Sequence, residues 1–305
     1  MNKILNFHLV NDIEWFDKII SLIKRKYNIV SIDTLEQYYN GTIKLKNACH
    51  ITVDDGDKTF YDIIYPVLKK YKVPASLYVS PKIFKNQTNY WFQEVEGYKV
   101  EILKRIIAEQ EKVEIQRLAQ YDIFTILKSF EISKIHDILK AYRDETNTPL
   151  KPYQNMSIEE LKEVDEFGLV TIGAHTMNHP ILNNETDDSS KYEISSSVEE
   201  LESLLGHSVK CFSYPNGIPG FDFTEREQNF LKQKNIKLTF STKAINFRFS
   251  DNVFSIPRIG VSNNENMLFL KAKLFLGSFW DYLKKVKSDG EYTQRKKLKE
   301  IFHVR

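Results

Sequence analysis

The chain has 305 residues, of which 42% are hydrophobic and 28% are charged, and its formal net charge is +2. This composition is typical of a globular protein with a sizeable core, in one large α/β domain or two smaller ones. It argues against a dedicated nucleic-acid binder, because phosphate contacts require a strong excess of basic residues.

The sequence as given also lacks the signals that direct a chain into or across a membrane. No run approaches the ~18 uncharged apolar residues of a spanning helix. The N-terminus has neither a long apolar region nor a small-residue cleavage site, so we expect a cytoplasmic location. The two cysteines, Cys49 and Cys211, lie in apolar segments without C-x-x-C spacing and are predicted to be buried free thiols.

The N-terminal part of the chain is predicted to alternate strands with helices. Strands are expected at residues 3–10, 29–32, 50–53 and 75–80. Apolar side chains at helical spacing predict a helix over residues 15–23, and a second helix is expected to open with a capping box at Thr34 and Gln37. A third helix is expected to break and restart at Pro66.

Residues 93–155 differ in character, because they are charged, almost free of glycine and rich in Ile, Leu, Lys and Glu. Helical periodicity predicts two or three helices here, inserted between a strand and the next strand–helix unit. Their charges are expected on solvated helix faces. The segment is introduced by Tyr90, Trp91 and Phe92, and its position suits a lid or the wall of a cleft.

Alternation of strands and helices resumes after the insert. Strands are expected at residues 170–173, 209–213, 238–242 and 254–256. Capping boxes at Ser157 with Glu160 and at Thr224 with Glu227 open two helices, and apolar periodicity predicts another at 194–205. This order implies a parallel sheet covered by helices. Since no glycine-rich phosphate loop follows a strand, we expect a closed or nearly closed barrel with its site at the C-terminal strand ends.

These elements predict one domain over residues 1–278, with the helical insert at about 93–155, followed by a basic helical tail at 279–305. A solvated helix is the simplest interpretation of this tail. A partner contact and a weak contact with a membrane surface are the alternatives.

Two adjacent carboxylates mark the end of the strand at 50–53. Asp54 and Asp55 follow the strand and precede Gly56. Ionised neighbours repel each other, so a stable fold needs a metal cation, a shared proton or exposure on a turn to keep them there.

A histidine pair follows the strand at 170–173 in the same way. His175 and His179 are four residues apart, which lets both imidazoles face one ion on a helical turn or a tight loop. Because strand ends converge in a barrel, the pair and the carboxylates are expected to meet. Two imidazoles and one carboxylate leave coordination positions open, as a hydrolytic metal site requires, and the spare carboxylate is then free to accept a proton from water.

A third strand end carries the segment Phe212–Gly217, in which Pro-Asn-Gly is a strong turn signal. The segment is either a simple turn or a turn that aims a backbone N–H into the site as an oxyanion donor.

In this order and spacing the three segments resemble the polysaccharide deacetylase family, the carbohydrate esterases with a NodB homology domain. The family motif T-F-D-D-G matches Thr52–Gly56, H-[S/T]-x-x-H matches His175–His179, and F-x-Y-P-Y-G matches Phe212–Gly217 in part. The resemblance covers roughly residues 1–92 and 155–262. It implies an α/β fold, a distorted and incomplete (β/α) barrel of the NodB type.

The resemblance also implies roles for individual residues. Asp55, His175 and His179 would bind a divalent metal, usually zinc. Asp54 would act as the general base that activates the metal-bound water, and the backbone N–H of Asn216 would stabilise the oxyanion.

Two positions depart from the family motifs. Ser213 stands where many members have an arginine that orients the catalytic aspartate, and Arg258 is the candidate to supply that guanidinium instead. The late L-x-H motif, whose histidine acts as a general acid, has no clear counterpart, and His8 is the candidate substitute. Tyr214, Trp91 and His8 are the predicted substrate contacts, since aromatic faces suit sugar rings.

The resemblance implies a metal-dependent hydrolase that removes an acetyl group from an N-acetylated sugar, either a cell-surface glycan or its precursor. Deformylation, or hydrolysis of another non-peptide amide, is the alternative on the same site. A catalytically silent carbohydrate-binding protein of the same fold is a third interpretation. The missing late histidine supports it, and the presence of Asp54 beside the metal ligand opposes it.

Overall fold

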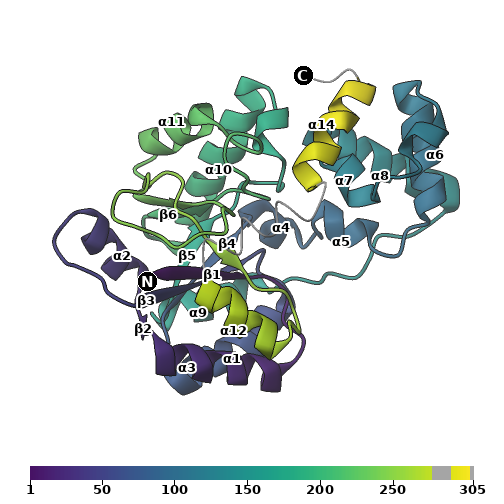
Figure 1. Cartoon of the computed structure of the whole chain (residues 1–305). Helices are drawn as coiled ribbons and strands as arrows, with labels where there is room; N and C mark the ends of the chain where they lie inside the picture. The colour runs from purple at the N-terminus through teal and green to yellow at the C-terminus, as the bar shows by residue number, and fades with distance from the viewer. Residues whose placement is uncertain (277–289, 303–305) are drawn as a thin grey trace.

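The computed structural model of the chain describes residues 1–276 and 290–302 and is built on one curled parallel sheet (Figure 1). Its eight strands are β1 (Lys3–Phe7), β2 (Asn28–Ile29), β3 (Ala48–Asp54), β4 (Ala75–Val79), β5 (Val170–Ala174), β6 (Cys211–Ser213), β7 (Leu238–Phe240) and β8 (Ile259–Gly260). The order along the sheet is β7-β6-β5-β4-β3-β1-β8, and β2 pairs with β3 off this path. All of these strand pairs are parallel.

The central strands are buried on both faces, which explains their almost continuous apolar sequences. Every residue of β1, β3 and β4 is buried, as expected for parallel strands covered by helices. Polar residues inside these strands therefore need partners within the fold. Thr52 of β3, for example, donates its hydroxyl to the carbonyl oxygen of Leu5 at 3.0 Å.

One short segment links the two edges of the sheet. Ile256 forms a parallel bridge with β7, and Ile259 pairs with β1. The strand expected at 254–256 is reduced to this bridge, because Pro257 has no N–H with which to continue a ladder. Residues 256–260 thus curl the sheet into the incomplete (β/α) barrel that the sequence predicts.

Helices cover both sides of the sheet. They are α1 (Ile13–Lys26), α2 (Ile32–Tyr39), α3 (Tyr65–Tyr71), α4 (Pro81–Asn86), α9 (Ile158–Glu166), α10 (Asp187–Leu205), α11 (Glu225–Gln233) and α12 (Met267–Leu276), with a 3₁₀ helix at Leu182–Asn184. In Figure 1, α1 and α3 lie below the sheet and α10 and α11 lie above it.

Local sequence signals explain several helix ends. The capping boxes predicted at Ser157 and Thr224 are confirmed. The one predicted at Thr34 is wrong, because Ser31 caps α2 and its hydroxyl accepts the N–H of Thr34. The helix expected to break at Pro66 instead continues, because a π-helix at Phe60–Ile64 runs directly into α3. Pro66 does lie in the first turn of α3, as predicted.

The inserted residues and the C-terminal helix form a second group of packed helices, called here the helical lobe. It consists of α5 (Trp91–Val95), α6 (Val100–Glu111), a 3₁₀ helix (Ile115–Leu118), α7 (Ile123–Leu127), α8 (Ile132–Thr146) and α14 (Glu291–Phe302). Figure 1 shows α14 beside α7 and α8, far from its neighbours in sequence.

The packing of α14 corrects the prediction of a solvated tail. Leu298, Ile301 and Phe302 are buried in the same apolar core as side chains of α6, α7 and α8. The prediction is wrong for residues 290–302, because these side chains cover the apolar face of the insert. Residues 279–289 and 303–305 of the predicted tail lie outside the described residues.

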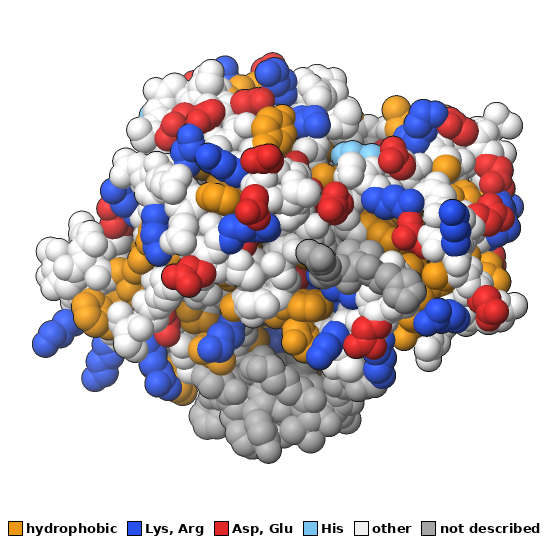
Figure 2. Space-filling view, turned by 90° about the horizontal axis from the view of Figure 1, so that it is seen from above, with side chains coloured by type: hydrophobic (Ala, Val, Ile, Leu, Met, Phe, Trp, Pro, Cys, Tyr) orange, Lys and Arg blue, Asp and Glu red, His pale blue; other side chains and the backbone are white. Residues whose placement is uncertain are grey.

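The surface carries both signs of charge. On the face shown in Figure 2, acidic and basic side chains are interspersed, without the basic stripe that tracks nucleic-acid phosphates. No helix within residues 1–276 and 290–302 is long and apolar enough to cross a membrane.

Candidate active site

The end of β3 brings two carboxylates to one edge of the sheet. Asp54 is the last residue of the strand, and Asp55 adopts a left-handed backbone with a φ of 75°. Gly56 follows with a φ of 71°, and a Cβ at this position would lie 2.5 Å from Cζ of Phe84. The left-handed region is uncommon for a residue with a Cβ, so this turn is a specific feature of the fold that places Asp55 beside the histidine loop.

Asp55, His175 and His179 lie together, as the sequence predicts. Asp55 Oδ1 is 3.6 Å from Nε2 of each histidine, and one ligand atom from each residue lies within 4.8 Å of the others. Asp55 Oδ1 is buried and has no hydrogen-bond partner in the described part of the chain. An unpaired buried carboxylate oxygen is costly, whereas a carboxylate with two imidazoles is a suitable donor set for zinc. The residues present therefore fit a divalent cation.

Hydrogen bonds from β6 and α10 hold the loop that carries the histidines. His175 Nδ1 donates to the carbonyl oxygen of Ser213 at 2.7 Å, which orients the ring and leaves Nε2 for a ligand. Glu193 of α10 accepts the backbone N–H groups of Met177 and Asn178, each at 2.9 Å. The loop is thus fixed by buried partners on two elements of the barrel.

The first turn of the helical lobe forms a wall beside this cluster. Tyr90 donates its hydroxyl to the carbonyl oxygen of Asp55 at 2.8 Å, and Trp91 Nε1 donates to that of His179 at 3.0 Å. The ring of Phe92 meets His179 edge-on, with 5.0 Å between centroids. Because Trp91 is 4% exposed, it offers no free face to a sugar. Trp91 was predicted to contact the substrate. In the structure its indole instead supports His179, a candidate metal ligand.

Asp54 is held by a separate set of partners. Arg258 donates from Nη1 and Nη2 to the two carboxylate oxygens at 2.8 and 2.9 Å, and Asn6 Nδ2 donates to Oδ2 at 3.1 Å. Arg258 Nη2 also donates to the hydroxyl of Ser213 at 2.7 Å. The guanidinium therefore reaches Asp54 from the segment before β8, as the sequence predicts, and Ser213 binds it.

The two neighbouring aspartates have opposite electrostatic environments. Burial would raise the pKa of Asp54, but the ion pair with Arg258 outweighs burial, and the pKa is lowered. Burial and the charge of Asp54 raise the pKa of Asp55 well above its ordinary value. Burial lowers the pKa of His175 to about 4 and that of His179 well below its usual range. At neutral pH the site therefore holds an ionised Asp54 beside neutral imidazoles.

Two further predicted residues lie near this centre. His8 directly follows β1, its Nε2 is 3.8 Å from Oδ2 of Asp54, and 53% of its side chain is exposed. Asn216 has a left-handed backbone with a φ of 56°. Its backbone N–H takes part in none of the hydrogen bonds among the described residues.

The predicted substrate contact at Tyr214 is wrong. The side chain is 1% exposed, its ring stacks on Phe223 with 3.6 Å between centroids, and its hydroxyl donates to the carbonyl oxygen of Phe254 at 3.1 Å. Tyr214 packs under the turn because its apolar ring completes the core there.

Sequence reasoning missed several residues that position the site. Asn6 is a polar residue between the apolar residues Leu5 and Phe7 of β1 and is paired in register with Thr52. This contrast was a usable signal. Glu193 is a buried acidic residue next to the apolar stripe of α10, and its position in the sequence was a second usable signal. Nothing in the sequence pointed to Lys128, whose Nζ donates to Asn216 Oδ1 at 2.9 Å.

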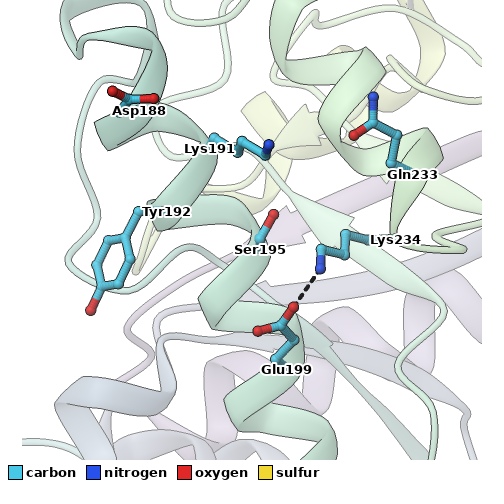
Figure 3. Close-up of a pocket in the computed structure, with 7 residues that line it drawn as sticks. All are labelled: Asp188, Lys191, Tyr192, Ser195, Glu199, Gln233 and Lys234. Atoms are coloured by element: carbon cyan, nitrogen blue, oxygen red, sulfur yellow. Dashed lines mark hydrogen bonds and ion pairs between the residues drawn. The ribbon is translucent and has the colours of Figure 1, made fainter.

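A separate hollow lies away from this site, on α10 and the end of α11 (Figure 3). Its volume is about 540 Å³, and an ion pair between Lys234 and Glu199 crosses it. None of the candidate metal ligands borders it. The chemistry of the chain is therefore placed at the strand ends rather than in this hollow.

Three solved structures share this fold. The Streptococcus pyogenes deacetylase PplD in complex with acetate is 17% identical, over 89% of this chain and 97% of that one, with a TM-score of 0.60. IcaB from Ammonifex degensii is 19% identical, over 85% and 91%, with a TM-score of 0.57. A de-N-acetylase from Aggregatibacter actinomycetemcomitans is 17% identical, over 89% and 98%, with a TM-score of 0.59.

Sequence comparisons identify the family. No curated protein matches the chain. The family model described as polysaccharide deacetylase matches residues 43–237, more than half of the chain, and this range includes the aspartate pair, the histidine pair and the turn at Asn216. The chain therefore belongs to the polysaccharide deacetylase family and is a hydrolase that acts on carbon–nitrogen bonds other than peptide bonds.

Proposed function

We propose that this protein is a metal-dependent deacetylase that removes the acetyl group from an N-acetylated sugar of a cell-surface glycan or its precursor. One observation carries the proposal. The cluster of Asp55, His175 and His179 lies next to a second carboxylate, Asp54, which Arg258 holds ionised. A protein that merely bound a metal or a sugar would have no use for this second, separately anchored carboxylate.

In this proposal Asp55, His175 and His179 hold a divalent cation, with zinc as the expected ion. When bound, such a cation polarises a carbonyl oxygen and lowers the pKa of water. The lowered pKa values of both histidines keep their rings neutral, as ligation requires.

Asp54 is proposed as the general base. Arg258 and Asn6 fix the orientation of its carboxylate before a substrate arrives, which lowers the entropic cost of reaching the reactive geometry. Asp54 accepts a proton from the attacking water while the water oxygen forms a bond to the acetyl carbon.

Asn216 and His8 are proposed for the two remaining tasks. The free backbone N–H of Asn216 donates to the oxyanion that develops on the acetyl oxygen. His8, beside Asp54 and half exposed, relays the proton that Asp54 has accepted from water to the nitrogen as the carbon–nitrogen bond breaks. Water thus supplies the hydroxyl of the released acetate and a proton to the sugar amine.

Acetyl is the proposed acyl group because two of the structural relatives are described as a deacetylase and a de-N-acetylase. A formyl group is smaller and would enter the same site, so release of formate is the outcome that distinguishes the alternative.

The test compares the wild type with Asp54→Asn and Asp55→Asn after loading with zinc. Zinc content is measured, together with acetate release from N-acetylglucosamine oligomers and formate release from their N-formyl counterparts. We expect Asp54→Asn to keep the metal and lose acetate release, and Asp55→Asn to lose the metal.

Each alternative has its own result in this experiment. Formate release without acetate release would replace deacetylation by deformylation. Oligomer binding without release of either acid would indicate a silent carbohydrate-binding protein. A wild type that binds no divalent ion would contradict the proposed metal site.

A further inference from the structure

The amide side chain of Asn216 is held at both of its ends. Its Oδ1 accepts a hydrogen bond from Lys128 Nζ at 2.9 Å, and its Nδ2 donates to Asp222 Oδ2 at 2.6 Å. The same oxygen of Asp222 accepts the backbone N–H of Ile218 at 2.8 Å. The turn that carries Asn216 is thus tied to a lysine of the helical lobe, just after α7.

The C-terminal helix α14 binds Asp222, the second partner of the Asn216 amide. Arg295 of α14 donates from Nη1 to Asp222 Oδ1 at 2.6 Å, and both side chains have 0% exposure. One turn earlier, Glu291 accepts a hydrogen bond from Lys128 at 3.1 Å and lies 3.5 Å from Arg295 Nη1. Five side chains therefore form a closed ring that runs from the turn through both parts of the helical lobe, namely Asn216, Lys128, Glu291, Arg295 and Asp222.

Stability alone does not explain Arg295. Its Nε and Nη2 are buried and have no hydrogen-bond partner among residues 1–276 and 290–302, although its guanidinium lies over the ring of Phe221 at 4.4 Å. Unpaired buried donors are costly, and apolar residues of similar volume often replace buried ion pairs without loss of stability. The apolar side chains of α14 already dock the helix on the lobe. What Arg295 adds is its bond to Asp222.

The backbone at Asn216 needs support of this kind. Its φ of 56° and the φ of 71° at Gly217 place two successive residues in the left-handed region. A residue with a side chain persists there when its surroundings hold it. The ring of hydrogen bonds supplies such a restraint through the amide of Asn216.

We propose that Lys128 and Arg295 are positioning residues, which hold the turn at Asn216 so that its backbone N–H faces the oxyanion. The helical lobe then completes the active site from outside the barrel. This inference rests on the proposed function, because it assigns the N–H of Asn216 to the reaction.

The test uses the full-length, zinc-loaded protein and the variants Lys128→Met and Arg295→Met, which remove charge and donors at similar volume. Lys140→Met is the matched control, because Lys140 lies on α8 with 68% of its side chain exposed and pairs with Asp144 one turn away. Amide hydrogen–deuterium exchange of residues 213–223 is measured by mass spectrometry. Zinc affinity, thermal unfolding, and kcat and KM on N-acetylglucosamine oligomers are measured alongside.

Both variants should exchange faster over residues 213–223 than the wild type. Their kcat should fall about ten- to a hundred-fold, as for a misplaced reacting group, while KM and zinc affinity stay unchanged. Lys140→Met should match the wild type in every measurement. In an Asn216→Gly background, Lys128→Met should have no further effect on kcat, because its effect passes through the amide side chain.

Exchange and kcat equal to those of Lys140→Met in both variants would overturn the proposal. The proposal would also be overturned if Lys128→Met lowered kcat equally in the wild type and in the Asn216→Gly background. Should Arg295→Met unfold, Lys128→Met decides, since 23% of the Lys128 side chain is exposed. A wild type without deacetylase activity would contradict the proposed function. The anchoring of the turn would still be tested by the exchange of residues 213–223, because that measurement does not depend on turnover.

Discussion

Arg258 binds both carboxylate oxygens of Asp54 at 2.8 and 2.9 Å, although 204 positions separate the two residues in the chain. The side chains are 0% and 3% exposed. Removal of one partner from a buried ion pair leaves an uncompensated charge, which typically costs about 3–5 kcal/mol. The pair therefore couples the stability of the barrel to the ionisation of the candidate base.

Arg258→Met is expected to lower the free energy of unfolding by about 3 kcal/mol at neutral pH and to raise the pKa of Asp54, so that kcat falls while zinc stays bound. Urea unfolding, kcat and zinc content check these effects. Arg105→Met is the control, because Arg105 pairs with Glu109 and Glu145 on the surface, where such pairs contribute about 0–1 kcal/mol. Equal losses of stability in the two variants would contradict the role of the buried pair.

Zinc affinity is expected to fall as the pH falls. The raised pKa of Asp55 means that its carboxyl binds a proton in the metal-free protein at a higher pH than a free aspartate does. The metal must displace that proton. The pKa of His175 is lowered to about 4, so the histidines compete for protons only in more acidic solution. Competition titrations from about pH 5 to 8 should show a weaker affinity at the lower pH and release of protons when zinc binds. An affinity independent of pH over this range would contradict the assignment.

Trp91→Phe is expected to weaken zinc binding about ten-fold, because loss of a partner of a metal ligand typically costs 10- to 100-fold. The variant removes the hydrogen bond from Nε1 to the carbonyl oxygen of His179. Trp15→Phe is the matched control, since its indole donates to the carbonyl oxygen of Glu265 at 2.9 Å, away from the cluster. Isothermal titration with zinc compares them, and equal affinities would show that the bond from Trp91 does not support the ligand.

Gly56→Ala is expected to destabilise the protein more than Gly97→Ala. Both glycines have a positive φ, of 71° and 82°, so both substitutions carry backbone strain. A Cβ at Gly56 would also lie 2.5 Å from Phe84, whereas nothing lies within 4 Å of one at Gly97. The difference between the two unfolding free energies measures this close contact, and a difference near zero would mean that Phe84 moves aside freely.

The sequence predicted those parts of the site that depend on strand ends. Asp54, Asp55 and the histidine pair each directly follow or end a strand, and parallel strands bring such positions to one edge. Period and capping signals likewise located α1, α9 and α11. Arg258 was predicted because a missing arginine in one motif required a substitute.

Contacts that depend on the path of long connections were not predictable. The orientation of Tyr214 into the core depends on Phe223 and Phe254, which lie beyond the turn. The docking of α14 depends on an apolar face that the insert forms only after its own helices pack. Neither periodicity nor a motif contains that information, so a basic helix was interpreted as solvated.

The segment at residues 256–260 has a consequence for folding. It joins both edges of the sheet, and Arg258 lies in its middle. A nascent chain that ends before this segment contains both aspartates and both histidines, yet Asp54 has no guanidinium beside it. In the complete fold, the charge of Arg258 lowers the pKa of Asp54 against the effect of burial. The segment that closes the barrel therefore also delivers the partner charge of the Asp54 carboxylate.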